Sequence, residues 1–579
     1  MADRPVRVGV DTGGTFTDAV FPDGSIAKVL STPSDPASAV GAAMAAARPD
    51  ELAHGTTVAT NALLERRGAR LALVTDPGFE DVIEIGRQNR PALYDGRVQR
   101  PVPLVPRELR VGAGIPVPSD VDGVAVCLLD ADLDPSAELA VADELRASGL
   151  DVTCSHEVSP EFREFERTVT TVIDAYLRPP CRDYLLRLAP LAARVLVLRS
   201  AGGLVPLEDA AVHPAGLLLS GPAGGVRAGA AAASAAGFPD AVTFDMGGTS
   251  TDVCLVLDGR PAPAAQRSVE GFPVRLPSLD VHTIGAGGGS IARIDAGGAL
   301  VVGPQSAGAD PGPACYGRGG TQPTVTDADL VAGRIPADAA FPGLDRLDRG
   351  AAQRALDAAG VTADGVIKVV DAAMVQAVRA VSVAQGVDPS GLALVAFGGA
   401  GPLHACAIAE ELGMAAVVVP PRAGVLSAVG ILGAPRQVDL VRSWPDPTDH
   451  AGATAALHDL ANAAAAELEG DVHVEVALDC RYAGQSHELQ CADVDDFHEQ
   501  HRRRNGFARL HAPVEVVALR ATATTPSPVD IESLAPPRAR QPALGPGVLS
   551  EPDCTVWVPD GWSAEVGGGG AWILQPSRS

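Results

Sequence analysis

Two short segments of this 579-residue chain carry nearly the same motif, and this duplication limits the possible folds more than any other feature. Residues 11–18 read DTGGTFTD and residues 245–252 read DMGGTSTD, which agree at six of eight positions. Each copy follows an apolar, β-branched run and precedes another, a pattern that predicts a strand, a tight turn and a returning strand. The chain is therefore expected to build the same hairpin twice, around one shared cleft.

The paired glycines of each copy indicate what the hairpins bind. Glycine allows a turn to take positive φ and lets backbone N–H groups approach an anion closely, and successive N–H groups form a concavity of phosphate size. The leading aspartates, Asp11 and Asp245, are of the type that holds Mg²⁺ directly or through water. A single Asp-x-Gly-Gly turn is also typical of an ordinary hairpin, but two copies with matched strands predict a split nucleotide site.

Lysine is scarce, which limits how phosphate can be held. The chain has only Lys28 and Lys368, and it has no Gly-x-x-x-x-Gly-Lys-Ser/Thr motif, so a P-loop is excluded. Both lysines fall in segments that read as strand or helix. We therefore expect backbone amides, hydroxyls, arginine and metal to hold the phosphates without a lysine.

Composition excludes several classes of protein. The formal net charge is −26 and aromatic residues make up 4%, so neither a polyanionic partner nor a stacking surface for nucleic acid is expected. No run of about 18 apolar residues predicts a membrane span. The nine cysteines include no Cys-x-x-Cys pair, so we expect no zinc site, no disulfide framework and a cytoplasmic location.

Changes of amino-acid composition along the chain predict three domains. They cover residues 1–190, 191–440 and 441–579, in line with the usual size of a domain. Glycine-dense turns at 283–290 and 398–404 are typical of backbone that approaches a ligand. The whole reads as an α/β protein.

One long helix is predicted to begin at Ser159-Pro160 and to end before Pro179-Pro180. Its charged residues are interpreted as a solvated face with pairing along the helix. They are Arg163, Glu164, Glu166 and Arg167.

Several of these segments together resemble one known family. The sequences VGVDTGGTFTD, HGTTVATNALLERRGA, LLSGPAGGV, FDMGGTSTDVCLV, HTIGAGGGSIARID, GPQSAGADPGPACYGRGG and FGGAGPLHA span roughly residues 6–435. They resemble the A subunits of the hydantoinase/5-oxoprolinase family, which includes subunits of acetone carboxylase. That family is part of the actin, sugar-kinase and chaperone ATPase superfamily. The resemblance implies two actin-like (ribonuclease H-like) ATPase domains flanking a nucleotide cleft, plus a smaller C-terminal α+β region.

The resemblance also implies ATP and Mg²⁺ as cofactors and assigns residues to them. Asp11 and Asp245 are expected to hold the metal, and Asp18 or Asp252 to orient the attacking oxygen, which makes these four the candidate catalytic residues. The residues expected to bind the nucleotide are Gly13, Gly14, Thr15, Thr17, Gly247, Gly248, Thr249, Thr251, Gly285, Gly287, Gly288, Gly398 and Gly399.

Three functions remain open on the sequence. The first is ATP-dependent hydrolysis of a cyclic amide such as a hydantoin, 5-oxoproline or another lactam, in which phosphorylation activates the carbonyl for ring opening. The second is carboxylation of a ketone, and the third is an ATP-driven binding or reactivation module. The resemblance implies a separate B subunit as partner and a homodimer within a hetero-oligomer, with no nucleic acid and no membrane.

Overall fold

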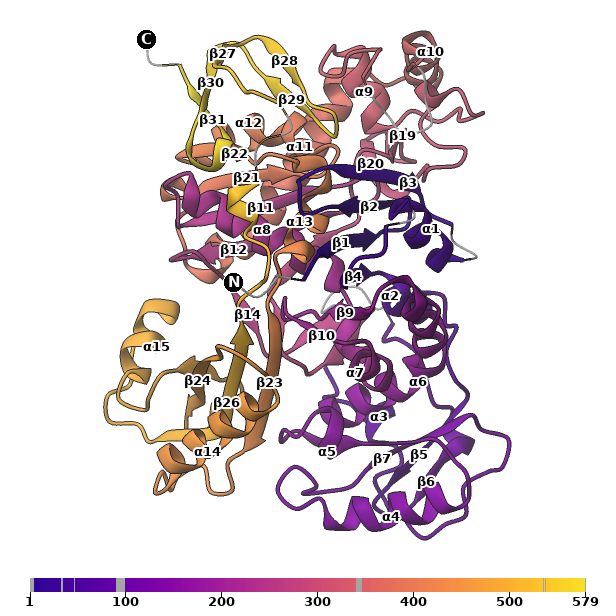
Figure 1. Cartoon of the computed structure of the whole chain (residues 1–579), viewed down its shortest axis with the longest axis vertical. Coiled ribbons are helices and arrows are strands. Elements are labelled where there is room, and N and C mark those ends of the chain that lie inside the picture. The colour runs from indigo at the N-terminus through magenta and orange to yellow at the C-terminus, as the bar shows by residue number, and fades with distance from the viewer. Residues whose placement is uncertain are drawn as a thin grey trace.

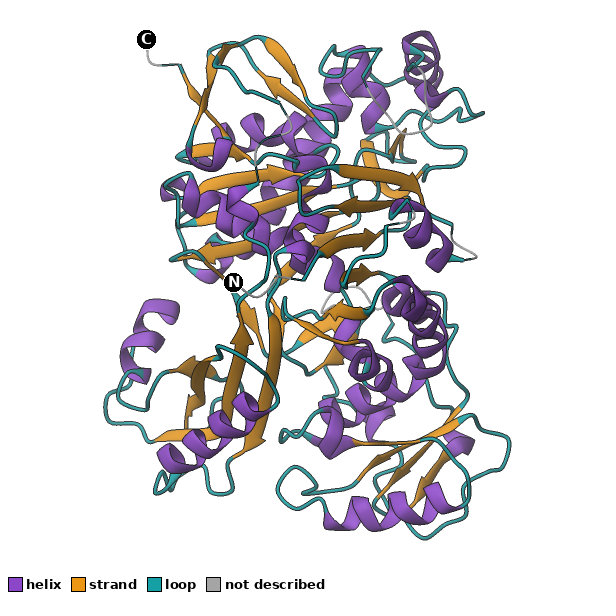
Figure 2. Cartoon of the chain, in the orientation of Figure 1, coloured by secondary structure: helices purple, strands orange, loops and turns teal. Residues whose placement is uncertain are grey.

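The structure, a computed structural model, describes residues 5–32, 35–45, 47–89, 99–339, 346–534, 536 and 538–577. It is a mixed α/β protein built on two large sheets, with helices on and between them (Figures 1 and 2). Within the described residues, no helix is long and apolar enough to cross a membrane.

The first large sheet has ten strands in the order β25-β24-β26-β23-β10-β9-β4-β1-β2-β3. Strands β1 to β3 form an antiparallel meander, and β1, β4 and β9 run parallel. From the β3 edge inward, the strands are β3 (Ile26–Leu30), β2 (Phe16–Val20), β1 (Arg7–Thr12), β4 (Glu51–Thr56), β9 (Arg194–Leu198) and β10 (Leu204–Pro206).

The second large sheet has nine strands and repeats this plan. Its order is β13-β12-β11-β21-β22-β31-β30-β27, with β18 also paired to β12. Here β12 is antiparallel to β11, β13 and β18, while β11, β21 and β22 run parallel, so five strands share the order and directions of β3-β2-β1-β4-β9. The strands are β11 (Ala241–Met246), β12 (Thr251–Leu257), β13 (Arg260–Pro261), β18 (Val281–Ile284), β21 (Ala393–Phe397) and β22 (Ala416–Val419).

Two helices join the halves. α8 (Ser220–Ala235) and α13 (Leu426–Leu432) cross where Gly430 lies directly on the backbone of Gly224, a contact that leaves no room for a Cβ at Gly430. α13 also packs closely on β1. A Cβ at Gly9 would lie only 2.5 Å from the carbonyl oxygen of Ala428 on α13.

The C-terminal quarter contributes strands to both sheets. β23 (Arg436–Ser443), β24 (His473–Tyr482), β25 (Leu489–Cys491) and β26 (Val514–Thr525) extend the first sheet. β27 (Ala543–Leu544), β30 (Trp562–Val566) and β31 (Trp572–Pro576) extend the second. The division into domains 1–190, 191–440 and 441–579 stays a prediction, and the last of these segments is shared between two sheets.

A separate four-stranded sheet projects from the first half, in the order β6-β5-β7-β8 (Figure 1). Its strands are β5 (Leu71–Thr75), β6 (Arg110–Gly112), β7 (Gly123–Cys127) and β8 (Val152–Cys154). The remaining short strands are β14 (Pro263–Ala264), β15 (Arg267–Val269), β16 (Phe272–Val274), β17 (Ser278–Leu279), β19 (Ser290–Ile294), β20 (Leu300–Ser306), β28 (Gly547–Ser550) and β29 (Thr555–Val558).

The other helices pack around these sheets. They are α1 (Pro36–Ala43), α2 (Val58–Leu64), α3 (Val82–Ile85), α4 (Ser136–Ala147), α5 (Ser155–Val158), α6 (Glu164–Leu188), α7 (Leu207–Val212), α9 (Val325–Val331), α10 (Arg349–Ala359), α11 (Ala363–Val381), α12 (Gly401–Leu412), α14 (Ala453–Ala466) and α15 (Phe497–Asn505).

The long helix α6 corrects two expectations. It runs through Pro179 and Pro180 to Leu188 instead of ending before them. Proline has no N–H, so Pro180 cannot bond the carbonyl of Tyr176 four residues back. That carbonyl instead accepts the N–H of Ala69 at 2.9 Å, which satisfies it and lets the helix continue.

The charged start of α6 is not a solvated face. Arg167 is 1% exposed and pairs with Asp132, and the buried Glu166 accepts from Arg87 at 2.6 Å. Glu164 is exposed as expected, but the expected pairing along the helix was wrong, because Arg163 and Arg167 pair with Glu488 and Asp132 of other segments. Periodicity could not show that the four-stranded sheet covers this end of the helix.

Candidate active site

The two duplicated hairpins occupy equivalent places in the two large sheets. Across β1 and β2 the paired residues are Asp11 and Asp18, and across β11 and β12 they are Asp245 and Asp252. In both, the N–H of the first loop glycine donates across the turn at 3.0 Å, from Gly13 to Phe16 and from Gly247 to Ser250. Each sheet thus presents two carboxylates at the mouth of one hairpin.

These carboxylates lie in one electrostatic neighbourhood. Burial, and after it the charges of Asp252 and Asp11, raise the pKa of Asp245 to about 8. Burial and the charge of Asp18 raise the pKa of Asp11 to about 7, and burial raises the pKa of Asp252 to about 6. The structure therefore brings the four predicted aspartates together across the two halves.

Lys28 supplies a positive charge to this cluster, which sequence reasoning missed. It lies on β3 directly opposite Asp18, and its Nζ pairs with the Asp18 carboxylate at 2.8 Å. Its charge lowers the pKa values of Asp11 and Asp245 against the stronger effect of burial. The sequence placed Lys28 in a strand or helix, which β3 confirms, but gave it no place beside these carboxylates. Counting the register across the turn at residues 21–25 would have placed it there.

Open space lies over three of the predicted glycines. A Cβ built on Gly14, Gly248 or Gly399 would meet nothing within 4 Å. All three residues are exposed. A ligand can therefore approach the backbone of both hairpin loops and of the turn after β21.

The other predicted glycines pack around the second hairpin loop. The N–H of Gly288 donates to Gly247 at 3.0 Å, and a Cβ on Gly287 would lie 2.7 Å from the same carbonyl oxygen. Gly398 takes φ of +78° directly beside the Asp245 carboxylate. Gly285 starts the same loop and is exposed. These four residues thus lie around the second hairpin loop. Their contact with a nucleoside stays a prediction.

The predicted threonines divide into two pairs. Thr17 and Thr251 are buried, with the Thr17 hydroxyl 3.1 Å from that of Ser31 and the Thr251 hydroxyl donating to Ala286 at 2.7 Å. Thr15 is half-buried and Thr249 exposed, each in the loop itself. The first pair fixes the loops, whereas the second pair is open to a ligand.

The donor set fits a magnesium nucleotide. Oδ1 of Asp11 is buried and has no hydrogen-bond partner among the described residues. A buried, unsatisfied carboxylate oxygen is costly unless a cation or donor completes it, and carboxylate oxygen is what Mg²⁺ prefers. Beside it stand Lys28 and two loops with free N–H groups, which suit phosphate oxygens.

A second missed residue comes from the C-terminal region. The Asp553 carboxylate accepts the N–H of Gly424 at 2.8 Å, and Lys28 reaches the carbonyl of the same glycine at 3.4 Å. Asp553 also raises the pKa of Asp18, after the larger effect of burial. No local motif marks Asp553, because its role depends on a contact across 129 residues.

A buried histidine stands behind each hairpin. His54 on β4 bonds the Tyr184 hydroxyl at 2.7 Å, and burial lowers its pKa to about 4. For His404 on α12, burial acts to lower the pKa, but the carboxylates of Asp329 and Asp371, at 3.2 and 2.6 Å, outweigh it and raise the pKa to about 10. One histidine is therefore neutral and the other charged at neutral pH.

The fold and this site define a mixed α/β protein with one acidic cleft formed by two matching hairpins. Family models describe the same chain in two parts: the hydantoinase/oxoprolinase N-terminal region matches residues 7–149, and hydantoinase/oxoprolinase matches residues 167–438. The chain belongs to the hydantoinase/oxoprolinase family.

Individual relatives cover most or all of the chain. The alpha subunit of caprolactamase from Pseudomonas jessenii is 32% identical over the whole of both chains. The gamma subunit of acetophenone carboxylase from Aromatoleum aromaticum is 33% identical over 73% of this chain and 67% of its own. The crystal structure of the ATP-dependent caprolactamase from Pseudomonas jessenii matches with a TM-score of 0.84 and 30% identity, over 99% of this chain and 100% of that one. Both named relatives are subunits of larger enzymes.

Proposed function

We propose that this chain is the ATP-binding subunit of a cyclic-amide hydrolase, which phosphorylates the carbonyl oxygen of a lactam or hydantoin. The observation that carries the proposal is the convergence of Asp11, Asp245 and Lys28 from both halves on one cleft. Such a constellation supplies the positioning and charge neutralisation that phosphoryl transfer needs. The similarity to a caprolactamase subunit over the full chain points to the same class of substrate.

The reaction balances as follows. The amide carbonyl oxygen attacks the γ-phosphorus of ATP, and the bond from that phosphorus to the ADP oxygen breaks. The phosphorylated carbonyl carbon is electrophilic, so water adds to it and the ring C–N bond opens, which leaves a free amino group and an acyl phosphate. A second water hydrolyses the acyl phosphate to the carboxylate of an amino acid and inorganic phosphate. Resonance makes an unactivated amide slow to hydrolyse, which is why ATP is consumed.

Each group in the cleft has a proposed part. Asp11 and Asp245 would hold Mg²⁺, which neutralises phosphate charge when bound. The loop amides of Gly14 and Gly248 would bind the phosphates, and Lys28 would leave Asp18 to meet the transferred phosphoryl group. Asp18 or Asp252 would then orient the attacking oxygen.

The repeated strand order supports the actin-like arrangement as part of this proposal. Five strands of each large sheet have the same order and directions, and the charges of Asp11 and Asp18 in the first half raise the pKa of Asp245 in the second. We propose that α8 and α13, which join the halves, form the hinge of a nucleotide cleft. The proposed assembly pairs a homodimer of this chain with a separate B subunit, which completes ring opening.

A ketone carboxylase subunit is the second candidate, because one relative at 33% identity is a subunit of acetophenone carboxylase. Both activities begin with transfer of phosphate to a carbonyl-derived oxygen. They differ in the need for bicarbonate and in whether the product gains carbon.

The test is an ATPase assay of the purified chain, with and without the neighbouring B protein, against hydantoins, 5-oxoproline, lactams and ketones. Stimulation of ADP release by a cyclic amide without bicarbonate is the expected result. Stimulation only by a ketone with bicarbonate would favour the second candidate. ATP turnover that no substrate stimulates would instead point to an ATP-driven binding module.

A further inference from the structure

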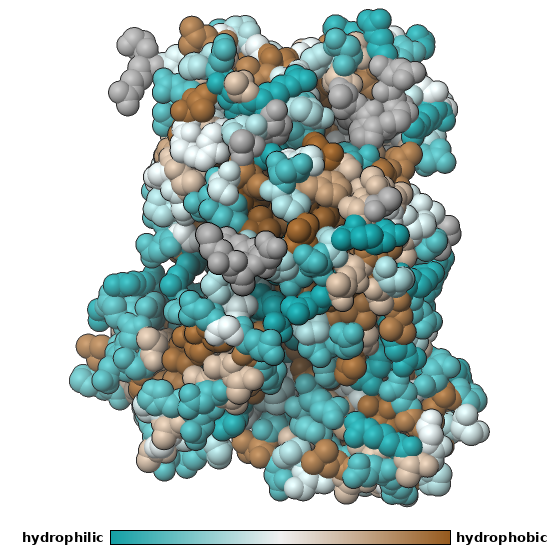
Figure 3. All heavy atoms as spheres, viewed as in Figure 1, coloured by the Kyte–Doolittle hydropathy of each residue, from teal (hydrophilic) through white to brown (hydrophobic). Residues whose placement is uncertain are grey.

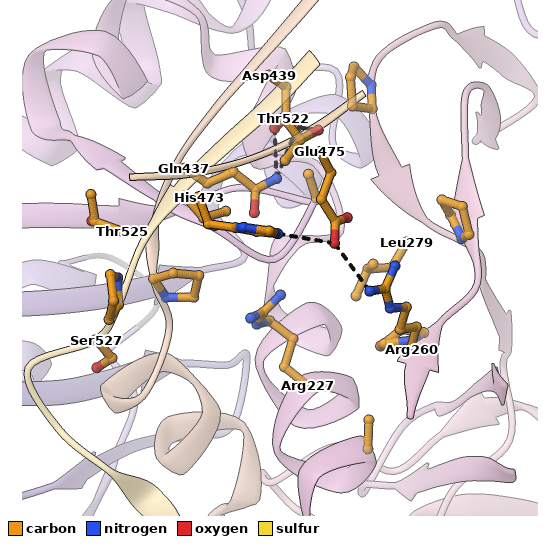
Figure 4. Close-up of a pocket in the computed structure, with 18 of the residues that line it drawn as sticks. Arg227, Arg260, Leu279, Gln437, Asp439, His473, Glu475, Thr522, Thr525 and Ser527 are labelled. Atoms are coloured by element: carbon orange, nitrogen blue, oxygen red, sulfur yellow. Dashed lines mark hydrogen bonds and ion pairs between the residues drawn. The ribbon is translucent and has the colours of Figure 1, made fainter. Parts of the chain in front are cut away.

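A cavity of about 1150 Å³ lies apart from the hairpin loops (Figure 4). Its walls come from α8, from β13, and from the sheet strands β23, β24 and β26, together with residues 526–532. None of the four cleft aspartates lines it. The cavity thus lies where the C-terminal strands meet the helix that joins the two halves.

Arg227 of α8 is the unusual residue in this cavity. Its guanidinium has no hydrogen-bond or ion-pair partner in the part of the chain that the structure describes. The residue is half-buried, and this burial lowers its pKa, with no neighbouring carboxylate among the described residues to offset the effect. A group of this kind is stabilised when an anion pairs with it.

The surrounding backbone fixes the direction of Arg227. Gly202 takes φ of +87°, and a Cβ there would lie 2.8 Å from Cδ of Arg227, so glycine leaves the space that the arginine stem occupies. In Figure 4 the guanidinium reaches from α8 into the cavity, while Gln437, His473 and Glu475 point into it from the opposite side.

The opposite wall is acidic. Asp439 accepts from the side chains of Gln437 and Thr522, both at 2.8 Å. Glu475 pairs at the rim with Arg260 at 3.3 Å and with His473 at 3.7 Å. Three more acids line the cavity, namely Asp471, Asp530 and Glu532.

We propose that this cavity binds a free amino acid, with its carboxylate on Arg227 and its ammonium group toward the acidic wall of β23 and β24. Arginine holds a carboxylate through two parallel hydrogen bonds, which gives both strength and orientation. A phosphate ester or dicarboxylate would place its second charge among the acids, where like charges repel. An uncharged molecule would leave Arg227 unpaired.

This inference does not depend on the proposed activity. The ring-opened product of a cyclic amide is one member of the same chemical class. Ser220, at the start of α8, lies 3.4 Å from the carbonyl oxygen of Thr56, close to Asp11 in the cleft. The cavity and the cleft therefore share one helix.

Titration calorimetry of the full chain tests the proposal with four matched probes. γ-Aminobutyrate and ε-aminocaproate carry both charges, caproate lacks the ammonium group and hexylamine lacks the carboxylate. Binding of at least one amino acid, and at least about tenfold weaker binding of both singly charged probes, is expected. Titrations are repeated with a saturating non-hydrolysable ATP analogue and Mg²⁺, which should leave amino-acid binding in place.

Arg227→Gln should weaken amino-acid binding by about tenfold or more, and Arg227→Lys, which keeps the charge but not the two-pronged geometry, by less. Arg260→Gln is the matched control, because this rim side chain is 77% exposed, and it should bind within about threefold of the unaltered protein. If Arg227→Gln does not fold, the Arg227→Lys variant and the four probes still test whether the cavity binds an amino acid. The proposal is overturned if neither amino acid binds, if binding is unchanged in the folded Arg227 variants, if caproate or inorganic phosphate binds as well as the amino acids, or if the nucleotide analogue displaces them.

Discussion

The two hairpins share a motif, a strand order and a pairing register, yet the strand paired to each one places a different residue beside its second aspartate. In the first hairpin that residue is charged, and in the second it is neutral. Opposite Asp18 on β3 stands Lys28, and at the same register position opposite Asp252 on β18 stands Thr283. Lys28 pairs with its aspartate as a cation, whereas Thr283 only donates a hydroxyl, at 2.5 Å. A duplicated loop can thus be specialised by one residue on a neighbouring strand.

This difference suggests how the two loops divide their work. In the proposed mechanism the first half would bring the charge of Lys28 to the phosphates, and the second half brings the carboxylate of Asp245, whose pKa is raised to about 8. If the two loops divide the work in this way, substitutions at equivalent positions of the two hairpins should reduce ATP turnover by unequal amounts. The predictions below test this asymmetry, beginning with the largest expected effect.

Lys28→Met should reduce substrate-stimulated ATP turnover by about 100-fold or more, because it removes the charge proposed to stabilise the transferred phosphoryl group. The matched change Thr283→Val removes one hydrogen bond to Asp252 and should cost about tenfold at most. Steady-state ADP release measures both. Circular dichroism provides the control for folding. Equal losses in the two variants would contradict the division of labour.

The two buried histidines should give the free energy of unfolding opposite dependences on pH. The folded pKa of His404, about 10, lies above its ordinary value of 6.5, so its stabilisation is complete below pH 6.5 and is lost as pH rises toward 10. The folded pKa of His54, about 4, lies below 6.5, so stability is lost as pH falls from 6.5 toward 4. A plot of unfolding free energy against pH should therefore fall on both sides, with an acid limb from His54 and an alkaline limb from His404. Each limb has a limiting slope of about 1.4 kcal/mol per pH unit for one proton.

Urea unfolding at several pH values checks this, with each histidine changed to glutamine. His404→Gln should remove the alkaline limb and destabilise the protein by about 3 kcal/mol, because it leaves Asp329 and Asp371 without their cation. His54→Gln should remove only the acid limb. An alkaline limb that persists in His404→Gln would show that His404 is not charged in the folded protein.

The smallest expected effect on stability comes from the exposed loop glycines. Gly14→Val and Gly248→Val should leave the melting temperature nearly unchanged, since no atom lies within 4 Å of either Cβ, but should weaken ATP binding by blocking the backbone. Gly287→Ala is the contrasting variant. Its Cβ would lie 2.7 Å from the Gly247 carbonyl, so it should destabilise the protein by about 1–3 kcal/mol. Normal ATP affinity in both valine variants would remove these loops from the nucleotide site.

The local parts of the fold could be predicted from the sequence. Both hairpins, and the strand Leu71–Thr75, follow from apolar runs bounded by turn residues, and the mixed α/β class was confirmed. The four aspartates were found because a repeated motif needs no knowledge of distant contacts. The same motifs indicated the hydantoinase/oxoprolinase family, and the matches to its two family models confirmed it.

What depends on contacts across the chain could not be predicted. The continuation of α6 past Pro180 requires the N–H of Ala69, more than a hundred residues earlier, to satisfy Tyr176. The burial of Arg167 requires Asp132 of another element, and the place of Asp553 requires the turn at Gly424. Lys28 is the exception, because hairpin register alone locates it.

The sharing of the last quarter of the chain between both large sheets has a practical consequence (Figure 1). The face drawn in Figure 3 already carries hydrophobic residues among the hydrophilic ones. Shortening the chain after β23 would strip edge strands from each half at once, leaving two unpaired ladders of N–H and C=O groups that invite aggregation. Engineers who seek a shorter fragment that keeps both hairpins should therefore retain residues 436–576.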